Sequence, residues 1–191
     1  MSCGFESNPR SDRFLVRTGH SMHVTRETTL RPRRALLVSA IVACCVSCDQ
    51  VSKSIATEQL AGNPPRSFAG DTLRLQYAEN PGAFLGWCDA LPEGARRLLL
   101  SYTVAALIVV FFVALLRARA RSVPSLCAGA MICGGGAGNL VDRFTRDGLV
   151  VDFLQCGVGG LRTGIFNLAD MAITTGVCFL VCASLKPKAP A

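Results

Sequence analysis

Two aspartates lie in strongly apolar sequence, where a carboxyl group is costly and usually functional. Asp152 stands within Val150-Val151-Asp152-Phe153-Leu154, with no basic residue nearby, and Asp170 closes the run Phe166-Asn167-Leu168-Ala169-Asp170. Two such carboxyls at one boundary could share a proton, so that the ionised group activates water and the protonated group polarises a carbonyl. The alternative is a pair of acids that only line a polar pocket.

A third aspartate in apolar sequence has a basic partner at helical spacing. Asp49 lies four residues before Lys53, which is the favourable order for an ion pair along one helix, so we expect a structural role for both. Asp142 and Arg143 adjoin, and Asn139 lies one turn earlier. Such a cluster at a helix end is expected to join loops through hydrogen bonds.

Other chemistries find little support in the sequence. The two histidines, His20 and His23, both precede the first apolar stretch, which leaves none for a Ser-His or Cys-His device near the acids. The basic residues are not interleaved with aromatic residues, which disfavours nucleic-acid binding. A small transporter or channel subunit, with the acids as a proton relay, is the alternative from another class, but it would place an acid near the bilayer midplane.

The cysteines do not form a convincing metal site. Cys45 and Cys48 have zinc-like spacing, but a second pair and a histidine cluster are missing, so we expect no metal and no cofactor. Cys88 and Cys156 could pair in an oxidising compartment, although the sequence cannot show that they approach each other.

The chain as a whole has the composition of a membrane protein. Half of its residues are hydrophobic and only 17% are charged, whereas a soluble domain has about 25%. The apolar residues gather into four stretches, each long enough to cross a bilayer: Ala35–Ile55, Leu98–Leu116, Val123–Val141 and Phe166–Leu185. The sequence therefore predicts an all-α integral membrane protein with four transmembrane helices.

The distribution of basic residues predicts the orientation of these helices. Seven arginines lie in residues 1–34, and further basic residues follow the second and fourth stretches: Arg117, Arg119, Arg121, Lys186 and Lys188. Basic residues favour the cytoplasmic side. Both termini are therefore expected in the cytoplasm, and Asp152 and Asp170 near the outer face.

Short motifs divide the chain further. Residues 1–34 are expected to form a basic, disordered cytoplasmic extension, of which residues 1–21 are optional because Met22 could start translation; residues 35–186 form the membrane domain and 187–191 a tail. The alternation in Thr72–Tyr77 predicts a strand, and hence a small strand-bearing platform between the first two helices. The glycine-rich run Gly134–Gly138 predicts close packing of the third helix against a neighbour.

Several motifs, taken together, resemble those of bacterial lipoprotein signal peptidase (signal peptidase II). They are Asp49-Gln50-Val51-Ser52-Lys53, Asn80-Pro81-Gly82-Ala83-Phe84, Gly138-Asn139-Leu140-Val141-Asp142-Arg143, Val150-Val151-Asp152-Phe153 and Phe166-Asn167-Leu168-Ala169-Asp170. The resemblance covers roughly residues 35–185. Many members have an extra alanine in the second of these motifs, whereas this chain continues Gly82-Ala83-Phe84-Leu85.

The resemblance implies a metal-independent aspartic peptidase of the bacterial inner membrane, with the platform on the periplasmic side. Asp152 and Asp170 would be the catalytic dyad. The polar residues around them would position substrate or dyad, namely Asn80, Asn139, Arg143 and Asn167, while Asp49, Lys53 and Asp142 would give structural support. The substrate would be a prolipoprotein whose lipobox cysteine carries diacylglycerol, cleaved just before that cysteine. Membrane lipid is the other expected partner, and the chain is expected to act as a monomer.

Overall fold

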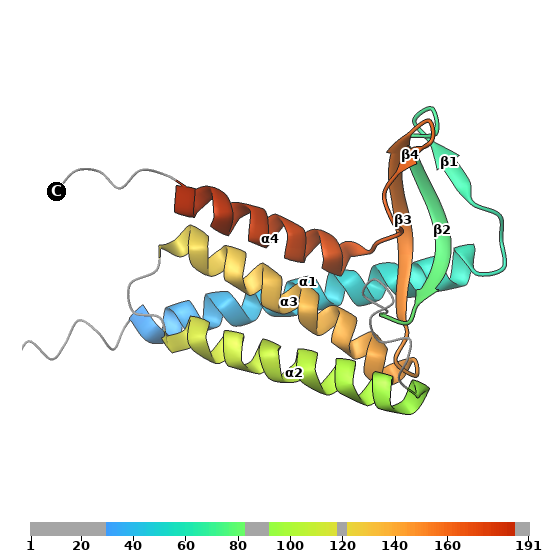
Figure 1. Cartoon of the computed structure of the whole chain (residues 1–191). Helices are drawn as coiled ribbons and strands as arrows, with labels where there is room; N and C mark the ends of the chain where they lie inside the picture. Colours follow the sequence, from blue (N-terminus) through green and yellow to red (C-terminus); the bar gives the residue numbers. More distant parts are fainter. Residues whose placement is uncertain (1–29, 83–91, 118–121, 186–191) are drawn as a thin grey trace, which may run out of the picture.

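A computed structural model describes residues 30–82, 92–117 and 122–185 (Figure 1). It contains four long helices and four strands, in the order α1 (Leu30–Leu60), β1 (Arg66–Phe68), β2 (Leu73–Asn80), α2 (Glu93–Arg117), α3 (Val123–Thr145), β3 (Val150–Val158), β4 (Leu161–Arg162) and α4 (Leu168–Leu185). The helices run side by side, and the sheet lies across one end of the bundle (Figure 1). Most of the predicted N-terminal extension, and Cys88, lie outside the described residues, so the Cys88–Cys156 disulfide stays a prediction.

Each predicted apolar stretch lies within a helix or largely coincides with one. Within the described residues, two helical segments are long and apolar enough to cross a membrane, Pro32–Leu60 and Leu168–Leu185, and Ser101–Arg117 is a shorter apolar segment. Glycine lowers the hydropathy of α3. The structure thus confirms a mostly helical chain with apolar helices, while the four crossings stay a prediction.

Helix α3 packs against the three other helices, because its glycines leave room for close approach. A Cβ atom added at Gly134 would lie 2.6 Å from the Cβ of Cys45 on α1, and one at Gly138 would lie 2.6 Å from Oδ2 of Asp49. One at Gly135 would collide with the backbone oxygen of Ala169 on α4. The predicted tight packing of the glycine-rich run is confirmed.

The sheet corrects one prediction. The strand expected at Thr72–Tyr77 is found within β2, but the platform is not confined to the connection between the first two helices. Its strands follow the order β1-β2-β3-β4 and are antiparallel, and β3 and β4 come from the connection between α3 and α4. The start of β3, Val150–Phe153, is buried on both faces. Its sequence therefore lacks the alternation that marks a half-buried strand.

The pairing of β2 with β3 sets the position of Asp152. Asp152 lies opposite Ala78, beyond a register shift that falls between Leu75 and Ala78. Asn80 is two residues further along β2 and hence on the same face of the strand as Ala78. The amide of Asn80 can therefore reach diagonally to the carboxyl of Asp152.

The far end of the sheet is held by one carboxylate. Nε and Nη2 of Arg74 both donate to Asp71 at 2.6 Å, and Arg162 on β4 donates to the same carboxylate. The hydrogen bonds from Arg74, followed by that from Ser67, hold the pKa of Asp71 well below its usual range. This cluster ties the β1–β2 turn to β4. Within β3, Phe153 packs on Ala56 and Leu60, which fixes the sheet to α1.

The close approach of α3 gives a first prediction. Gly135→Ala should destabilise the protein by about 1–3 kcal/mol, because the new methyl group meets the backbone oxygen of Ala169, which cannot move away without shifting α4. The neighbouring Gly136→Ala is the matched control, since its methyl group meets only the end of the Ile108 side chain, at 3.0 Å. Thermal unfolding in detergent measures both. Equal melting temperatures for the two variants would contradict the packing described.

Candidate active site

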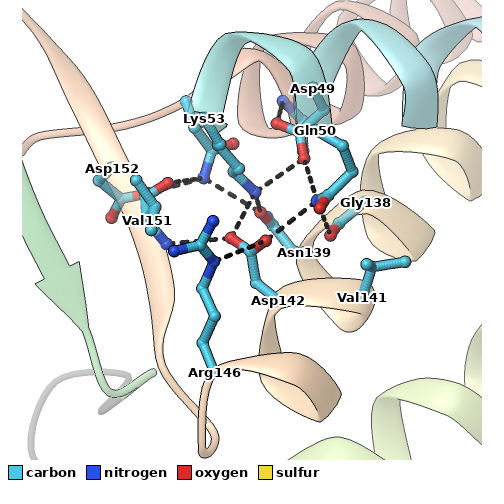
Figure 2. A network of polar contacts seen from close by, with 12 residues as sticks. Asp49, Gln50, Lys53, Gly138, Asn139, Val141, Asp142, Arg146, Val151 and Asp152 are labelled. Atoms are coloured by element: carbon cyan, nitrogen blue, oxygen red, sulfur yellow. Dashed lines mark hydrogen bonds and ion pairs between the residues drawn. The ribbon is translucent and has the colours of Figure 1, made fainter. Parts of the chain in front are cut away.

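Four elements bring polar side chains together at the end of the bundle beneath the sheet. The C-terminal half of α1 provides Asp49 and Lys53, and the last turns of α3 provide Asn139, Asp142 and Arg143. Strand β3 provides Asp152, and the start of α4 provides Asn167 and Asp170. Figure 2 shows how the residues from α1, α3 and β3 point toward one another. Nearly all of the residues singled out in the sequence therefore meet in one network.

Asp152 is buried, with only 2% of its surface exposed. Its Oδ1 accepts a hydrogen bond from Nδ2 of Asn167 at 2.6 Å, and its Oδ2 accepts one from Nδ2 of Asn80 at 3.0 Å. Burial raises the pKa of the Asp152 carboxyl, and the nearby charge of Asp170 acts in the same direction, against the opposing effect of the two amides. Asp152 is thus biased toward keeping a proton.

Asp170 is held at the start of α4 by a reciprocal cap. The backbone N–H of Asp170 donates to Oδ1 of Asn167 at 3.0 Å, and the backbone N–H of Asn167 donates back to Oδ2 of Asp170 at 3.2 Å. This is the arrangement of a capping box, with Asn and Asp in place of the more common residues. Nδ2 of Asn139 donates to the other oxygen, Oδ1, at 2.8 Å.

Two asparagines connect the two carboxyls. Asn167 donates to Asp152 and caps Asp170, so one side chain fixes both acids. Nδ2 of Asn167 also lies 3.0 Å from Oδ1 of Asn139, which in turn holds Asp170. The sequence predicted positioning roles for Asn80, Asn139 and Asn167, and the structure places all three in contact with an acid.

The ammonium group of Lys53 lies at the centre of the supporting network (Figure 2). Its Nζ is 2.7 Å from Oδ2 of Asp49, 3.0 Å from Oδ2 of Asp142 and 2.8 Å from Oδ1 of Asn139. The side chains of Lys53, Asp49 and Asp142 are fully buried. The predicted Asp49–Lys53 ion pair is confirmed, and Lys53 has an additional carboxylate partner that its spacing in the sequence did not indicate.

The two supporting aspartates also hold the backbone beside the two other acids. Oδ1 of Asp49 accepts from the N–H of Ala169 at 2.9 Å, and Oδ2 of Asp142 accepts from the N–H of Val151 at 3.0 Å. Ala169 directly precedes Asp170, and Val151 directly precedes Asp152. Each supporting carboxylate therefore fixes the chain one residue before a candidate catalytic carboxyl.

Comparison with known proteins identifies this arrangement. The sequence model described as signal peptidase (SPase) II, of the Peptidase A8 family, matches residues 41–186. The lipoprotein signal peptidase of Streptomyces coelicolor is 30% identical over 190 residues, covering 97% of this chain and 88% of the relative. That of Chlorobium phaeobacteroides is 34% identical over 141 residues, covering 70% and 80%. The chain belongs to the signal peptidase II family. It is therefore an aspartic peptidase.

A solved structure of a membrane enzyme has a similar fold. A bacterial membrane enzyme determined by the in meso method at 1.9 Å resolution matches with a TM-score of 0.65 and 25% identity, covering 80% of this chain and 94% of the other. The region matched by the signal peptidase II model contains every candidate site residue, from Asp49 to Asp170. The family assignment favours a peptidase over the alternative of a small transporter.

Gln50 belongs to the site but was not singled out from the sequence. Nε2 of Gln50 donates to Oδ1 of Asp142 at 3.0 Å, to the backbone oxygen of Gly138 at 3.1 Å and to Oδ2 of Asp49 at 3.3 Å. It fixes α1 against α3 beside Lys53. The available signal was its place in the signal peptidase II motif Asp49-Gln50-Val51-Ser52-Lys53, since a lone amide in an apolar helix needs a partner.

The guanidinium group of Arg143 uses only part of its hydrogen-bonding capacity. Its Nη1 donates to the backbone oxygen of Asn139 at 3.3 Å, while its buried Nε has no hydrogen-bond partner within the described part of the chain. The guanidinium group thus retains an unused donor next to the acids.

Asp170 also opens to the surface. It lines a groove of about 500 Å³, whose other lining residues are Thr163, Gly164, Ile165, Phe166, Met171, Thr174 and Thr175. Asp152 does not line this groove. One acid is thus accessible from the groove, and the other is enclosed behind it.

The buried Lys53 cluster gives a second prediction. Lys53→Met should destabilise the signal peptidase by about 3–5 kcal/mol, because Asp49 would remain buried without its cation and Asp142 would keep only its longer ion pair to Arg146. Glu58→Gln is the control, since Glu58 is exposed on the same helix. Urea-induced or thermal unfolding in detergent would show the difference. A Lys53→Met protein as stable as Glu58→Gln would mean that the cluster contributes little to the fold.

Proposed function

We propose that this chain cleaves diacylglyceryl-modified prolipoproteins just before the lipidated cysteine, with Asp152 and Asp170 as its catalytic dyad. The family assignment makes the chain a lipoprotein signal peptidase. The observation that supports the dyad is that Asn167 bonds to both carboxyls: its side chain donates to Asp152, and its backbone N–H donates to Asp170. This fixes the relative position of the two acids.

The two acids differ in environment, and this difference suggests their roles. Asp170 lines the groove and can hold a water molecule there, so as a carboxylate it acts as the base. Asp152 is enclosed, and its pKa is raised by burial, so it carries the proton and donates a hydrogen bond to the oxygen of the scissile carbonyl. Opposed environments of this kind separate the acid from the base in a carboxyl pair.

The reaction then follows from these positions. Water attacks the carbonyl carbon of the residue before the lipidated cysteine, and its proton passes to Asp170. Asp152 gives its proton to the carbonyl oxygen as the tetrahedral intermediate forms. The intermediate returns that proton to Asp152 on collapse, while Asp170 protonates the amine of the departing cysteine. The pair ends with one proton, as it began.

The surrounding polar residues position the reacting groups in this proposal. Asn80 and Asn167 hold Asp152, and Asn139 holds Asp170. Arg143, which donates to the backbone oxygen of Asn139 beside the acids, positions the substrate or the dyad. Asp49, Lys53 and Asp142 give structural support, and no metal ion takes part.

The proposal includes a location for the enzyme. The four helices cross the bacterial inner membrane as one peptidase domain, residues 35–186, with both termini in the cytoplasm. Residues 1–34 form a basic cytoplasmic extension, of which residues 1–21 are dispensable, and residues 187–191 form a tail. The dyad lies near the periplasmic face, where the scissile bond is accessible while the acyl chains of the substrate stay in lipid. The enzyme acts as a monomer.

The dyad gives the third prediction. Asp152→Asn and Asp170→Asn should each lower cleavage of a lipidated precursor in detergent by about 10²–10⁴-fold or more, since each removes one half of the acid–base pair. The double variant should lose little more, because the two residues act as a unit. Asp147→Asn should remain active, since Asp147 is exposed in a turn at φ 55°, a conformation that asparagine adopts readily.

Stability separates catalysis from folding in this test. Asp152 has a raised pKa in the folded state, so its ionisation costs stability as the pH rises above the ordinary value for aspartate. The free energy of unfolding of Asp152→Asn at neutral pH should therefore be close to that of the parent, or higher. A well-folded Asp152→Asn protein that still cleaves would exclude Asp152 from the dyad, and loss of activity on adding a chelator would exclude a metal-independent reaction.

The pH dependence gives the fourth prediction. The rate should follow a bell-shaped profile, because the pair works only with one proton: it loses its base at low pH and its acid at high pH. Burial raises the pKa of Asp152, so the alkaline limb should lie above the usual range of an aspartate. Measuring kcat/KM against pH on one lipidated precursor tests this. If kcat/KM instead falls as the pH rises through the ordinary pKa range of an aspartate, Asp152 does not retain its proton as proposed.

A further inference from the structure

The groove at Asp170 continues away from the dyad along the exposed face of α4. Thr174 lies one helical turn beyond Asp170, and Thr175 and Met171 line the same groove, while the segment 163–166 closes its other side. The helix runs from the sheet toward the opposite end of the bundle (Figure 1). In the proposed orientation, the groove therefore descends from the catalytic site into the membrane.

The hydroxyl groups in this groove are available for bonding. Thr57, Thr145 and Ser184 each donate to the backbone oxygen four residues earlier in their helices. Thr174 and Thr175 are exposed and have no hydrogen-bond partner among the residues that the structure describes. Their hydroxyls can therefore bond to a molecule in the groove, at a depth where water is scarce.

The substrate needs such partners on one side of the cleaved bond. A peptide bond must leave helical structure to present its carbonyl to the dyad, and this exposes N–H and C=O groups of the neighbouring residues. Unpaired backbone groups in hydrocarbon cost several kcal/mol each. The signal peptide extends from the periplasmic face into the membrane, as the groove does, so its last residues lie beside α4.

We propose that the hydroxyls of Thr174 and Thr175 hydrogen-bond the backbone of the unwound segment on the signal-peptide side of the scissile bond. This inference rests on the proposed function and extends it to substrate recognition. An acyl chain in the same groove would have no use for hydroxyl groups, because it has no polar atoms to pair. The threonines bind the peptide without selecting its side chains, which suits an enzyme that must accept many sequences.

The experiment compares two double variants in detergent. Thr174→Val with Thr175→Val removes both hydroxyls at nearly constant shape, and Thr174→Ser with Thr175→Ser retains them. The valine variant should raise KM for a lipidated precursor by about tenfold with little change in kcat, as expected for lost bonds made equally in the bound and transition states. The serine variant should stay within about twofold of the parent. Both should keep the parental melting temperature.

Ser47→Ala is the control, because it removes an exposed hydroxyl from α1 outside this groove, and its KM should not change. Parental KM in the valine variant would overturn the inference, as would an equal rise of KM in the serine variant or in Ser47→Ala. These results are distinct from a failure of the proposed function, which would appear as cleavage by Asp152→Asn.

Discussion

The site depends on one buried ammonium group. Lys53 is fully buried and contacts Asp49, Asp142 and Asn139, so one ammonium group is shared by two buried carboxylates. Asp142 has a second, longer ion pair, with Nε of Arg146 at 3.7 Å. Removing an ion from water costs several kcal/mol, and that cost is recovered only when the geometry and the remaining hydrogen bonds are good. Here each carboxylate also accepts from a backbone N–H, and Gln50 bonds to both. The network thus fixes α1, α3, β3 and the start of α4 relative to one another.

This use of Lys53 leaves Asp152 without a cation of its own. Asp152 is buried, its partners are the amides of Asn80 and Asn167, and it makes no ion pair within the described residues. Arg143 lies nearby but donates to a backbone oxygen. A buried carboxyl in this position is most readily accommodated with a proton. The same network that holds the fold together therefore prepares one acid of the proposed dyad, while Asp170 lines the groove.

Much of the site could be predicted from single residues, and the rest required the fold. Asp152 and Asp170 stand out because a carboxyl group in apolar sequence is costly and usually functional. The Asp49–Lys53 ion pair follows from the four-residue spacing of its members. The bond from Asp142 to Lys53 could not be foreseen, because it depends on how closely the glycines of α3 approach α1. Strand β3 was missed because its start is buried on both faces and so lacks alternation. The asparagine bridge at Asn167 depends on that strand.

The central claim is that the two carboxyls hold one proton between them while the enzyme works, with Asp152 as its main site. Infrared difference spectroscopy of the purified enzyme tests this directly, because a protonated carboxyl has a carbonyl stretching band that a carboxylate lacks. At the pH of maximal cleavage, the account predicts such a band in the parent enzyme and its loss in Asp152→Asn. A parent enzyme without the band, or a band that persists unchanged in Asp152→Asn, would contradict it.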